Sequence, residues 1–131
     1  MKRQKKSEFL TDFEKLTEIG YDLSMQFQGV YAPTRRLGYS TRFLARIIEC
    51  CFSILQLIPN SKFAGKKLEY LDFHSVASLL RDLIEACNHG WYLTIEKVDE
   101  FDEELRLAIY DYHDMSEMKT FAKQMGFVKT D

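Results

Sequence analysis

The chain has 131 residues, of which 46% are hydrophobic and 29% are charged, a composition that excludes a mostly disordered protein. This length can bury a sizeable core, so we expect residues 1–131 to form a single helical domain behind a flexible basic tail at residues 1–6. Only 2 Pro and 6 Gly are present, which favours long helices over a many-turned β architecture.

The sequence also indicates the cellular compartment of the protein. No apolar run approaches the ~18 residues that a membrane-spanning helix needs, and no apolar region follows the basic start as it would in a secretory signal. The three cysteines (Cys50, Cys51 and Cys87) are odd in number and lack C-x-x-C spacing, so they form neither a disulfide framework nor a zinc signature. We therefore expect a cytoplasmic protein with reduced thiols and no membrane contact.

The net charge of −2 is unevenly distributed. Residues 1–67 carry 12 Lys or Arg and 6 Asp or Glu, a net charge of +6, and residues 68–131 carry 6 and 14, a net charge of −8. A basic first half could bind a polyanion such as RNA. Because the basic residues are scattered, we favour the alternative that the two halves neutralise each other within one fold or across a dimer.

The first predicted helix begins at Ser7, a favourable N-cap, and continues toward a break at Pro33. Its apolar residues recur at alternating three- and four-residue steps, a pattern typical of a helix packed in a bundle. We expect this stripe to face the core; it consists of Phe9, Phe13, Leu16, Leu23, Phe27 and Val30, with Gly20 in the remaining position. Thr34 is the expected cap of a second helix that ends at Pro59, with an apolar face of Leu37, Leu44, Ile47, Ile48, Cys51, Leu55 and Ile58.

Asp72 and Asp99 are the expected caps of the third and fourth helices. The third apolar stripe consists of Phe73, Val76, Ala77, Leu80, Ile84, Cys87 and Trp91. The fourth consists of Phe101, Leu105, Ala108, Ile109, Tyr112, Met115 and Ala122, and Gly126 is a natural stop. Four helices of about 20 residues with short connections predict an all-α, four-helix antiparallel up-down bundle.

Arg106 and His113 are the candidate catalytic residues. Seven residues apart on a helix, they point the same way two turns apart. Arginine can hold a phosphate bidentately and stabilise the charge of the transition state, while a neutral histidine can take the proton of a 2′-hydroxyl. This pair predicts metal-independent RNA cleavage without a cofactor. The alternative is an Arg106 that pairs with Asp99, Asp102 or Glu103, beside an exposed His113.

The segments Ser75-Val-Ala-Ser-Leu-Leu-Arg-Asp-Leu-Ile-Glu85 and Arg106-Leu-Ala-Ile-Tyr-Asp-Tyr-His113 resemble a HEPN domain (higher eukaryotes and prokaryotes nucleotide-binding) and a group of uncharacterised bacterial helical proteins. The resemblance covers roughly residues 70–120. It implies a four-helix bundle, often homodimeric, whose members include toxin and defence ribonucleases with Arg, four to six residues, and then His on a late helix. Catalytic members usually carry a polar residue after the Arg, and here that position is Leu107. A two-fold dimer would bring two Arg/His pairs into one cleft.

Arg81 and Glu85 are second-strand candidates, since they lie with His74 on the flank of the third stripe, each within about 20° of the direction of His74. The alternative for them is a simple i,i+4 pair. No metal site is expected, because the Glu-x-x-His pairs of a di-iron bundle are absent.

The alternative function is a non-catalytic helical-bundle interaction module, self-associating or bound to a protein partner through its apolar seams. A third class is a small-ligand pocket between helices. Catalysis requires Arg106 and His113 side by side in a basic cleft. The interaction module instead predicts them apart or paired with acidic neighbours, with an apolar strip exposed elsewhere.

Overall fold

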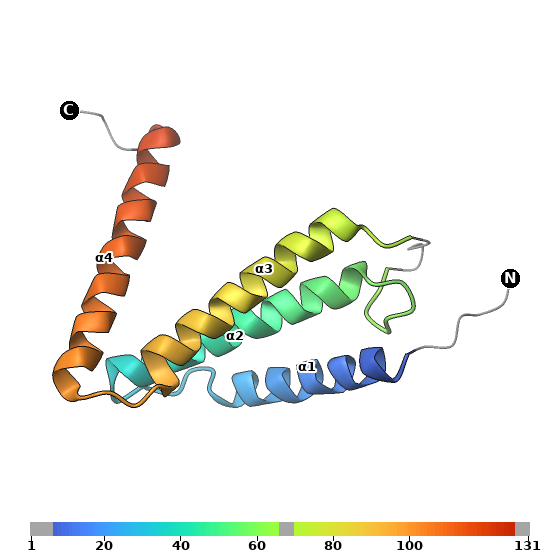
Figure 1. Cartoon of the computed structure of the whole chain (residues 1–131), viewed down its shortest axis with the longest axis horizontal. Helices are drawn as coiled ribbons and strands as arrows, with labels where there is room; N and C mark the ends of the chain where they lie inside the picture. The colour runs from blue at the N-terminus through green and yellow to red at the C-terminus, as the bar shows by residue number, and fades with distance from the viewer. Residues whose placement is uncertain (1–6, 66–69, 128–131) are drawn as a thin grey trace, which may run out of the picture. The chain divides into compact units, whose positions relative to one another are not determined.

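The computed structural model describes residues 7–65 and 70–127 (Figure 1). The basic tail expected at residues 1–6 lies outside this part, as do residues 66–69. The described residues form helices and no strand, which confirms the all-α class. The elements are α1 (Glu8–Gln26), α2 (Arg35–Leu57), α3 (Phe73–Gly90), a short π-helix η1 (Trp91–Ile95) and α4 (Glu100–Gln124). In this part of the chain no helix is long and apolar enough to cross a membrane.

All four α-helices begin at the caps that the sequence predicts. Ser7 and Thr34 accept the backbone N–H of Leu10 and Leu37 at 3.1 and 3.2 Å. Asp72 and Asp99 likewise accept the N–H of the third residue of their helices, at 3.2 and 2.8 Å. Each bond satisfies a donor that the first turn leaves without an intrahelical partner. The end of α4 is also as predicted, because Gly126 follows its last turn with a φ of 75°.

The chain divides into two compact units, Met1–Thr94 and Ile95–Asp131. In the first unit, α2 packs against both α1 and α3, and it runs in the opposite direction to both (Figure 1). Two glycines permit close approach: a Cβ at Gly20 would collide with Ile48 Cδ1, and one at Gly90 would lie 3.4 Å from the Cβ of Phe43. The buried apolar residues of the three helices are Leu10, Phe43, Ile48, Cys51, Ile54, Leu55, Val76 and Ala86.

Of the predicted stripe of α1, Gly20 packs closely on α2, but the buried face of the helix is a different one. Its buried residues are Leu10, Glu14 and Thr17, whereas Phe9 and Leu16 of the stripe are exposed. At about 100° per residue, the two faces are about 120° apart. The heptad spacing is real, but it marks a second apolar face of the helix.

The same correction applies to α3. Of its predicted stripe only Val76 is buried, beside Ala86 and Gly90. Phe73, Leu80 and Ile84 are exposed, about 100° from the face that packs on α2. Two helices of the first unit therefore carry an apolar face that the unit itself does not cover.

Among the described residues of the second unit, α4 is the α-helix. The stripe predicted to point inward is exposed, at Phe101, Leu105, Ile109, Tyr112 and Met115. Within its own unit α4 meets no second helix among the described residues, so this unit alone supplies no helix on which the stripe could pack.

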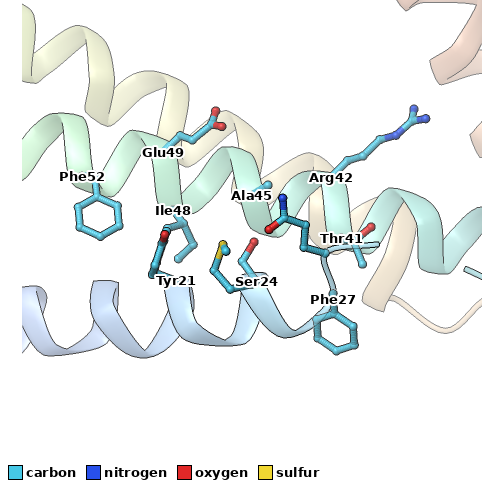
Figure 2. A pocket seen from close by; sticks show the side chains of 11 residues that line it. Tyr21, Ser24, Phe27, Thr41, Arg42, Ala45, Ile48, Glu49 and Phe52 are labelled. Atoms are coloured by element: carbon cyan, nitrogen blue, oxygen red, sulfur yellow. The ribbon is translucent and has the colours of Figure 1, made fainter. Parts of the chain in front are cut away.

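A groove of about 480 Å³ runs between the second half of α1 and the middle of α2 (Figure 2). Tyr21 and Phe52 face each other at its end, with ring centroids 5.6 Å apart in an edge-to-face arrangement. Arg42 and Glu49 of α2 border it, as Figure 2 shows. Both charged residues are exposed, so α2 has a polar side as well as its packed ones.

Candidate functional site

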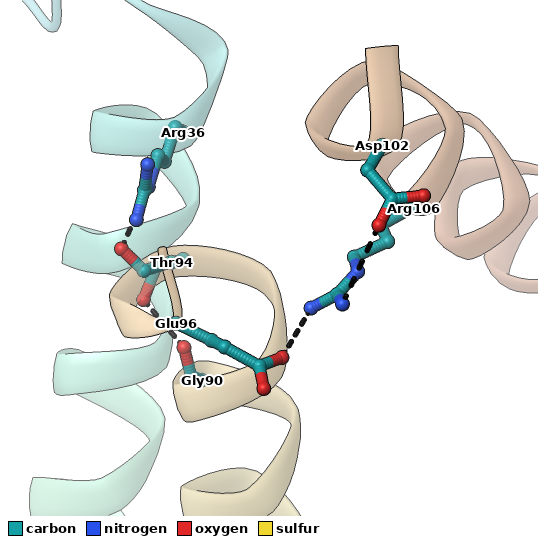
Figure 3. Close-up of polar contacts among 6 residues, drawn as sticks. All are labelled: Arg36, Gly90, Thr94, Glu96, Asp102 and Arg106. Atoms are coloured by element: carbon teal, nitrogen blue, oxygen red, sulfur yellow. Dashed lines mark hydrogen bonds and ion pairs between the residues drawn. The ribbon is translucent and has the colours of Figure 1, made fainter. Parts of the chain in front are cut away.

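Arg106 and His113 lie on one continuous helix, α4, and point to the same side of it, about 20° apart at 100° per residue. The Arg106 guanidinium is held by two carboxylates (Figure 3). Its Nη1 pairs with Oε2 of Glu96, and its Nη2 lies 3.8 Å from Oδ2 of Asp102, one turn earlier in the helix. Only 15% of the Arg106 side chain is exposed, so this guanidinium is largely enclosed.

His113 is much more open, with 71% of its side chain exposed. Its Nε2 lies 3.7 Å from Oε1 of Glu117, one turn further along α4. Asp102, Arg106, His113 and Glu117 therefore form one polar row along the helix, with a carboxylate at each end.

The charge of α4 works against a phosphate ligand. The helix carries seven Asp or Glu and three Lys or Arg, a net charge of −4. A phosphodiester approaching Arg106 must compete with Glu96 and Asp102 for the same guanidinium N–H groups. Nucleic-acid binding depends on an excess of positive charge at the contact. The described part of this helix does not supply that excess.

Of the carboxylates Glu96 and Asp102 that hold Arg106, the sequence indicates Asp102 but not Glu96. Asp102 was among the expected acids, since an i,i+4 spacing brings it close. Glu96 precedes α4, ten residues from Arg106, and no helical spacing connects them. Leu107, the residue where a catalytic HEPN-like site usually has a polar side chain, is fully buried.

Arg81 and Glu85, the second-strand candidates, lie on α3 in the other unit and are both exposed. They share one side of α3 with His74, as their spacing predicts. They stand beside the uncovered apolar stripe of that helix. The structure thus places them next to a hydrophobic surface of the first unit.

The end of α3 is tied to α2 by a long-range bond that the sequence did not reveal. After Gly90 the helix widens into η1, and Thr94 Oγ1 donates to the carbonyl of Gly90 at 2.5 Å (Figure 3). The Nε of Arg36, in the first turn of α2, donates to the carbonyl of Thr94 at 2.7 Å. This bond caps the C-terminal end of η1 with a charged donor.

The thiols and carboxylates offer little other chemistry. Within residues 7–65 and 70–127, no group of three or more His, Cys, Asp or Glu side chains could hold a metal ion. Burial raises the pKa of Cys51 and of Cys50 above the ordinary value of 9.0, which keeps both thiols protonated. Cys87 is exposed on α3.

A second hollow, of about 220 Å³, lies where the chain turns from α1 to α2. Its walls are almost wholly apolar, from Phe27, Val30, Pro33, Leu37 and Leu44. A small-molecule site needs a few convergent polar groups to orient its ligand. Of the polar residues that line this hollow, Ser40 and Thr41 already donate their hydroxyls to backbone carbonyls of α2 and of its first turn.

The described residues form an all-helical protein whose helices carry large exposed apolar faces. No family model, no curated protein and no solved structure matches the chain.

Proposed function

We propose that this chain is a non-catalytic helical association module, which binds a helical surface of another protein molecule through one apolar side. The observation that supports it best is the pair of uncovered stripes on α1 and α3. Phe9 and Leu16 on α1 are 81% and 66% exposed, and Phe73 and Ile84 on α3 are 71% and 60% exposed. Contiguous apolar surface of this kind typically marks an interaction site.

Both stripes lie on the same side of the three-helix layer. Viewed from its N-terminal end, a right-handed helix advances clockwise by about 100° per residue. The α1 stripe lies about 120° anticlockwise of the residues that face α2, and the α3 stripe about 100° clockwise of them. Because α1 and α3 run in parallel on opposite sides of α2, these opposite rotations bring both stripes to one side (Figure 1).

The antiparallel up-down bundle predicted from the sequence belongs to this proposal. Three helices in a layer leave one long side open, and a helix laid along that side would complete a four-helix bundle. The stripes have the three- and four-residue steps that such packing uses. The carboxylates around Arg106 and His113 support the same view, since they neutralise the cation that an RNA site would need.

The test is the mass of the full chain in solution. We expect sedimentation equilibrium to give an assembly larger than 15.5 kDa, and Leu16→Glu with Leu80→Glu to reduce it to the monomer. Gln56→Glu with Gln124→Glu is the matched control, because it adds the same two charges at exposed positions of α2 and α4. A monomeric wild type that gains no partner at any concentration would refute the proposal.

A second candidate function is metal-independent RNA cleavage by an HEPN-like site, with Arg106 holding phosphate and His113 as base or acid. One observation favours it: the two side chains share one side of α4. Cleavage of a mixed RNA pool in EDTA tests it, beside Arg106→Ala, His113→Ala and the control Lys119→Ala. Cutting that only the first two variants lose would establish the site, and no cutting by folded wild type would remove it.

RNA as a partner, homodimerisation and a cytoplasmic location remain predictions from the sequence. Self-association is the one that the apolar side of the layer supports.

A further inference from the structure

The uncovered stripe of α3 has a symmetry of its own. Its members recur at steps of four and three residues over five turns and are all exposed: Phe73, Ala77, Leu80, Ile84, Cys87 and Trp91. In an antiparallel pair of identical helices, each residue meets the one equally far from the midpoint. The midpoint of this stripe is Asp82.

Stripe residues that are equally far from Asp82 have side chains of the same type. Phe73 corresponds to Trp91, both aromatic; Ala77 to Cys87, both small; and Leu80 to Ile84, both branched aliphatic. In a two-fold interface residue i contacts residue j while j contacts i, so each of these contacts would join apolar side chains of matching size or shape. The spacing alone does not produce it.

The charges beside the stripe suit the same arrangement. Arg81 and Glu85 are exposed on its flank, one residue before and three residues after the midpoint. In the antiparallel pair, Arg81 lies about 3 Å along the axis from the partner's Glu85. Two equivalent ion pairs would then form, one at each Arg81. The two second-strand candidates thus acquire a role in pairing two copies of this chain.

The stripe of α1 has part of this symmetry, at nearly the same level, although its Leu16 corresponds to Gly20, which packs on α2. Phe9 and Phe27, and Phe13 and Leu23, are equally far from a midpoint at Glu18. Gly20 packs on Ile48 and Gly90 packs on Phe43, five residues earlier in α2. This offset puts Glu18 about 1.5 Å along the layer from the midpoint of α3. One two-fold axis can therefore serve both helices.

We propose that the apolar side of the layer is covered by a second copy of this chain, with α3 packed antiparallel on the partner's α3 about Asp82. This inference rests on the proposed association function and specifies its partner, surface and register. Ala77 then faces the partner's Cys87, whereas the two Cys87 residues lie about 15 Å apart along the axis.

Disulfide trapping reads this register directly. We would place Ala77→Cys in a full chain that carries Cys50→Ser and Cys51→Ser, and oxidise it with diamide. Each new bond joins two thiols, and diamide takes up their two protons and two electrons. The matched control is Ser78→Cys, exposed and one residue further on, about 100° away from the stripe.

We expect Ala77→Cys to form a covalent dimer, twice 15.5 kDa, with peptides of residues 77 and 87 joined. The Ser78→Cys control and the parent with Cys87 alone should stay monomeric under denaturing conditions. A parent that crosslinks through Cys87 alone would instead show parallel pairing and overturn the register. Circular dichroism of each variant confirms that it is folded.

The mass of the unoxidised chain separates the two claims. A chain that associates by sedimentation yet gives no 77–87 bond would overturn this register and leave the proposed function standing. A chain that stays monomeric at every concentration and binds no other protein would overturn both the association function and this register. Ile84→Glu supplies an independent check, because it should lower the associated fraction without a cysteine in the experiment.

Discussion

The backbone N–H of Lys62 donates to Oε1 of Glu14, 48 residues earlier in the chain, over 2.7 Å. Glu14 is 2% exposed and lies on the face of α1 that packs on α2. The segment that follows α2 is thereby bound to the middle of α1. A second contact joins the same two segments at the surface, where Lys62 Nζ lies 2.5 Å from Oε1 of Glu18.

Glu14→Ala should lower the free energy of unfolding of the chain by about 1–3 kcal/mol, because it leaves a part-buried N–H without its acceptor. Glu14→Gln keeps a carbonyl oxygen at the site and should cost less. Glu18→Ala is the surface control, with an expected loss below about 1 kcal/mol. Urea unfolding followed by circular dichroism measures all three. Equal losses for Glu14→Ala and Glu18→Ala would contradict this account of the Glu14 contact.

Gly20 and Gly90 should respond differently to alanine. Both changes gain helix propensity, up to about 1 kcal/mol. The new Cβ at position 20 collides with buried Ile48, whereas the one at position 90 makes ordinary contact with Phe43. We expect Gly20→Ala to be less stable than Gly90→Ala by about 1–3 kcal/mol.

The double variant Gly20→Ala with Ile48→Val isolates the cause, since valine lacks the Cδ1 atom that the new Cβ would meet. Its loss should be smaller than the sum of the two single losses, as measured by a double-mutant cycle. Strict additivity would mean that Gly20 is not the close-approach point between α1 and α2.

Asp72 makes the start of α3 sensitive to acid. Hydrogen bonds from Ser75 Oγ, at 2.7 Å, and from its backbone N–H hold the pKa of the Asp72 carboxyl below its ordinary value of 3.8. A carboxyl with a lowered folded-state pKa stabilises the fold above the unfolded value and loses that effect as the pH falls through the folded value.

Wild type should therefore exceed Asp72→Asn in melting temperature near neutral pH, and the difference should shrink below about pH 4. Asp72→Ala should be lower than both at neutral pH, because asparagine still caps a helix and alanine does not. Melting curves from pH 2 to 7 test this. A difference between wild type and Asp72→Asn that persists unchanged at pH 2 would exclude the charge as its cause.

The helix starts could be predicted from sequence because they are local. A side-chain oxygen at Ser7, Thr34, Asp72 or Asp99 reaches the third residue on regardless of the rest of the fold. The direction of the apolar stripes was not local. In α1 and α3, heptad spacing identified an apolar face correctly, but periodicity cannot say which of two faces meets the neighbouring helix.

The buried face of α1 was missed for a related reason. It contains Glu14 and Thr17, polar residues that no hydrophobic pattern selects. Thr17 Oγ1 donates to the carbonyl of Phe13 at 2.8 Å, and Glu14 accepts from a distant loop. Their burial depends on partners that only the folded chain brings together. Glu96 beside Arg106 was missed in the same way.

Releasing Arg106 should reveal whether its carboxylate partners suppress anion binding. Glu96→Gln with Asp102→Asn removes both negative charges while keeping the side-chain shapes. We expect binding of a short single-stranded RNA, measured by fluorescence anisotropy at low salt, to strengthen by roughly tenfold, and to weaken again as salt rises. The control Asp111→Asn with Asp114→Asn changes the net charge of the chain equally. Equal gains in the two double variants would show that only net charge matters.

Trp91 offers the most direct test of the central claim, because it is the single tryptophan of the chain, is 58% exposed, and lies where the uncovered stripe continues from α3 into η1. Its emission and acrylamide quenching would be followed over a dilution series of wild type, with Leu80→Glu as the monomeric reference. We predict that wild type at high concentration emits at shorter wavelength than the reference, resists quenching, and approaches the reference on dilution. Emission and quenching equal to those of Leu80→Glu at every concentration would contradict the claim that this apolar side is covered by association.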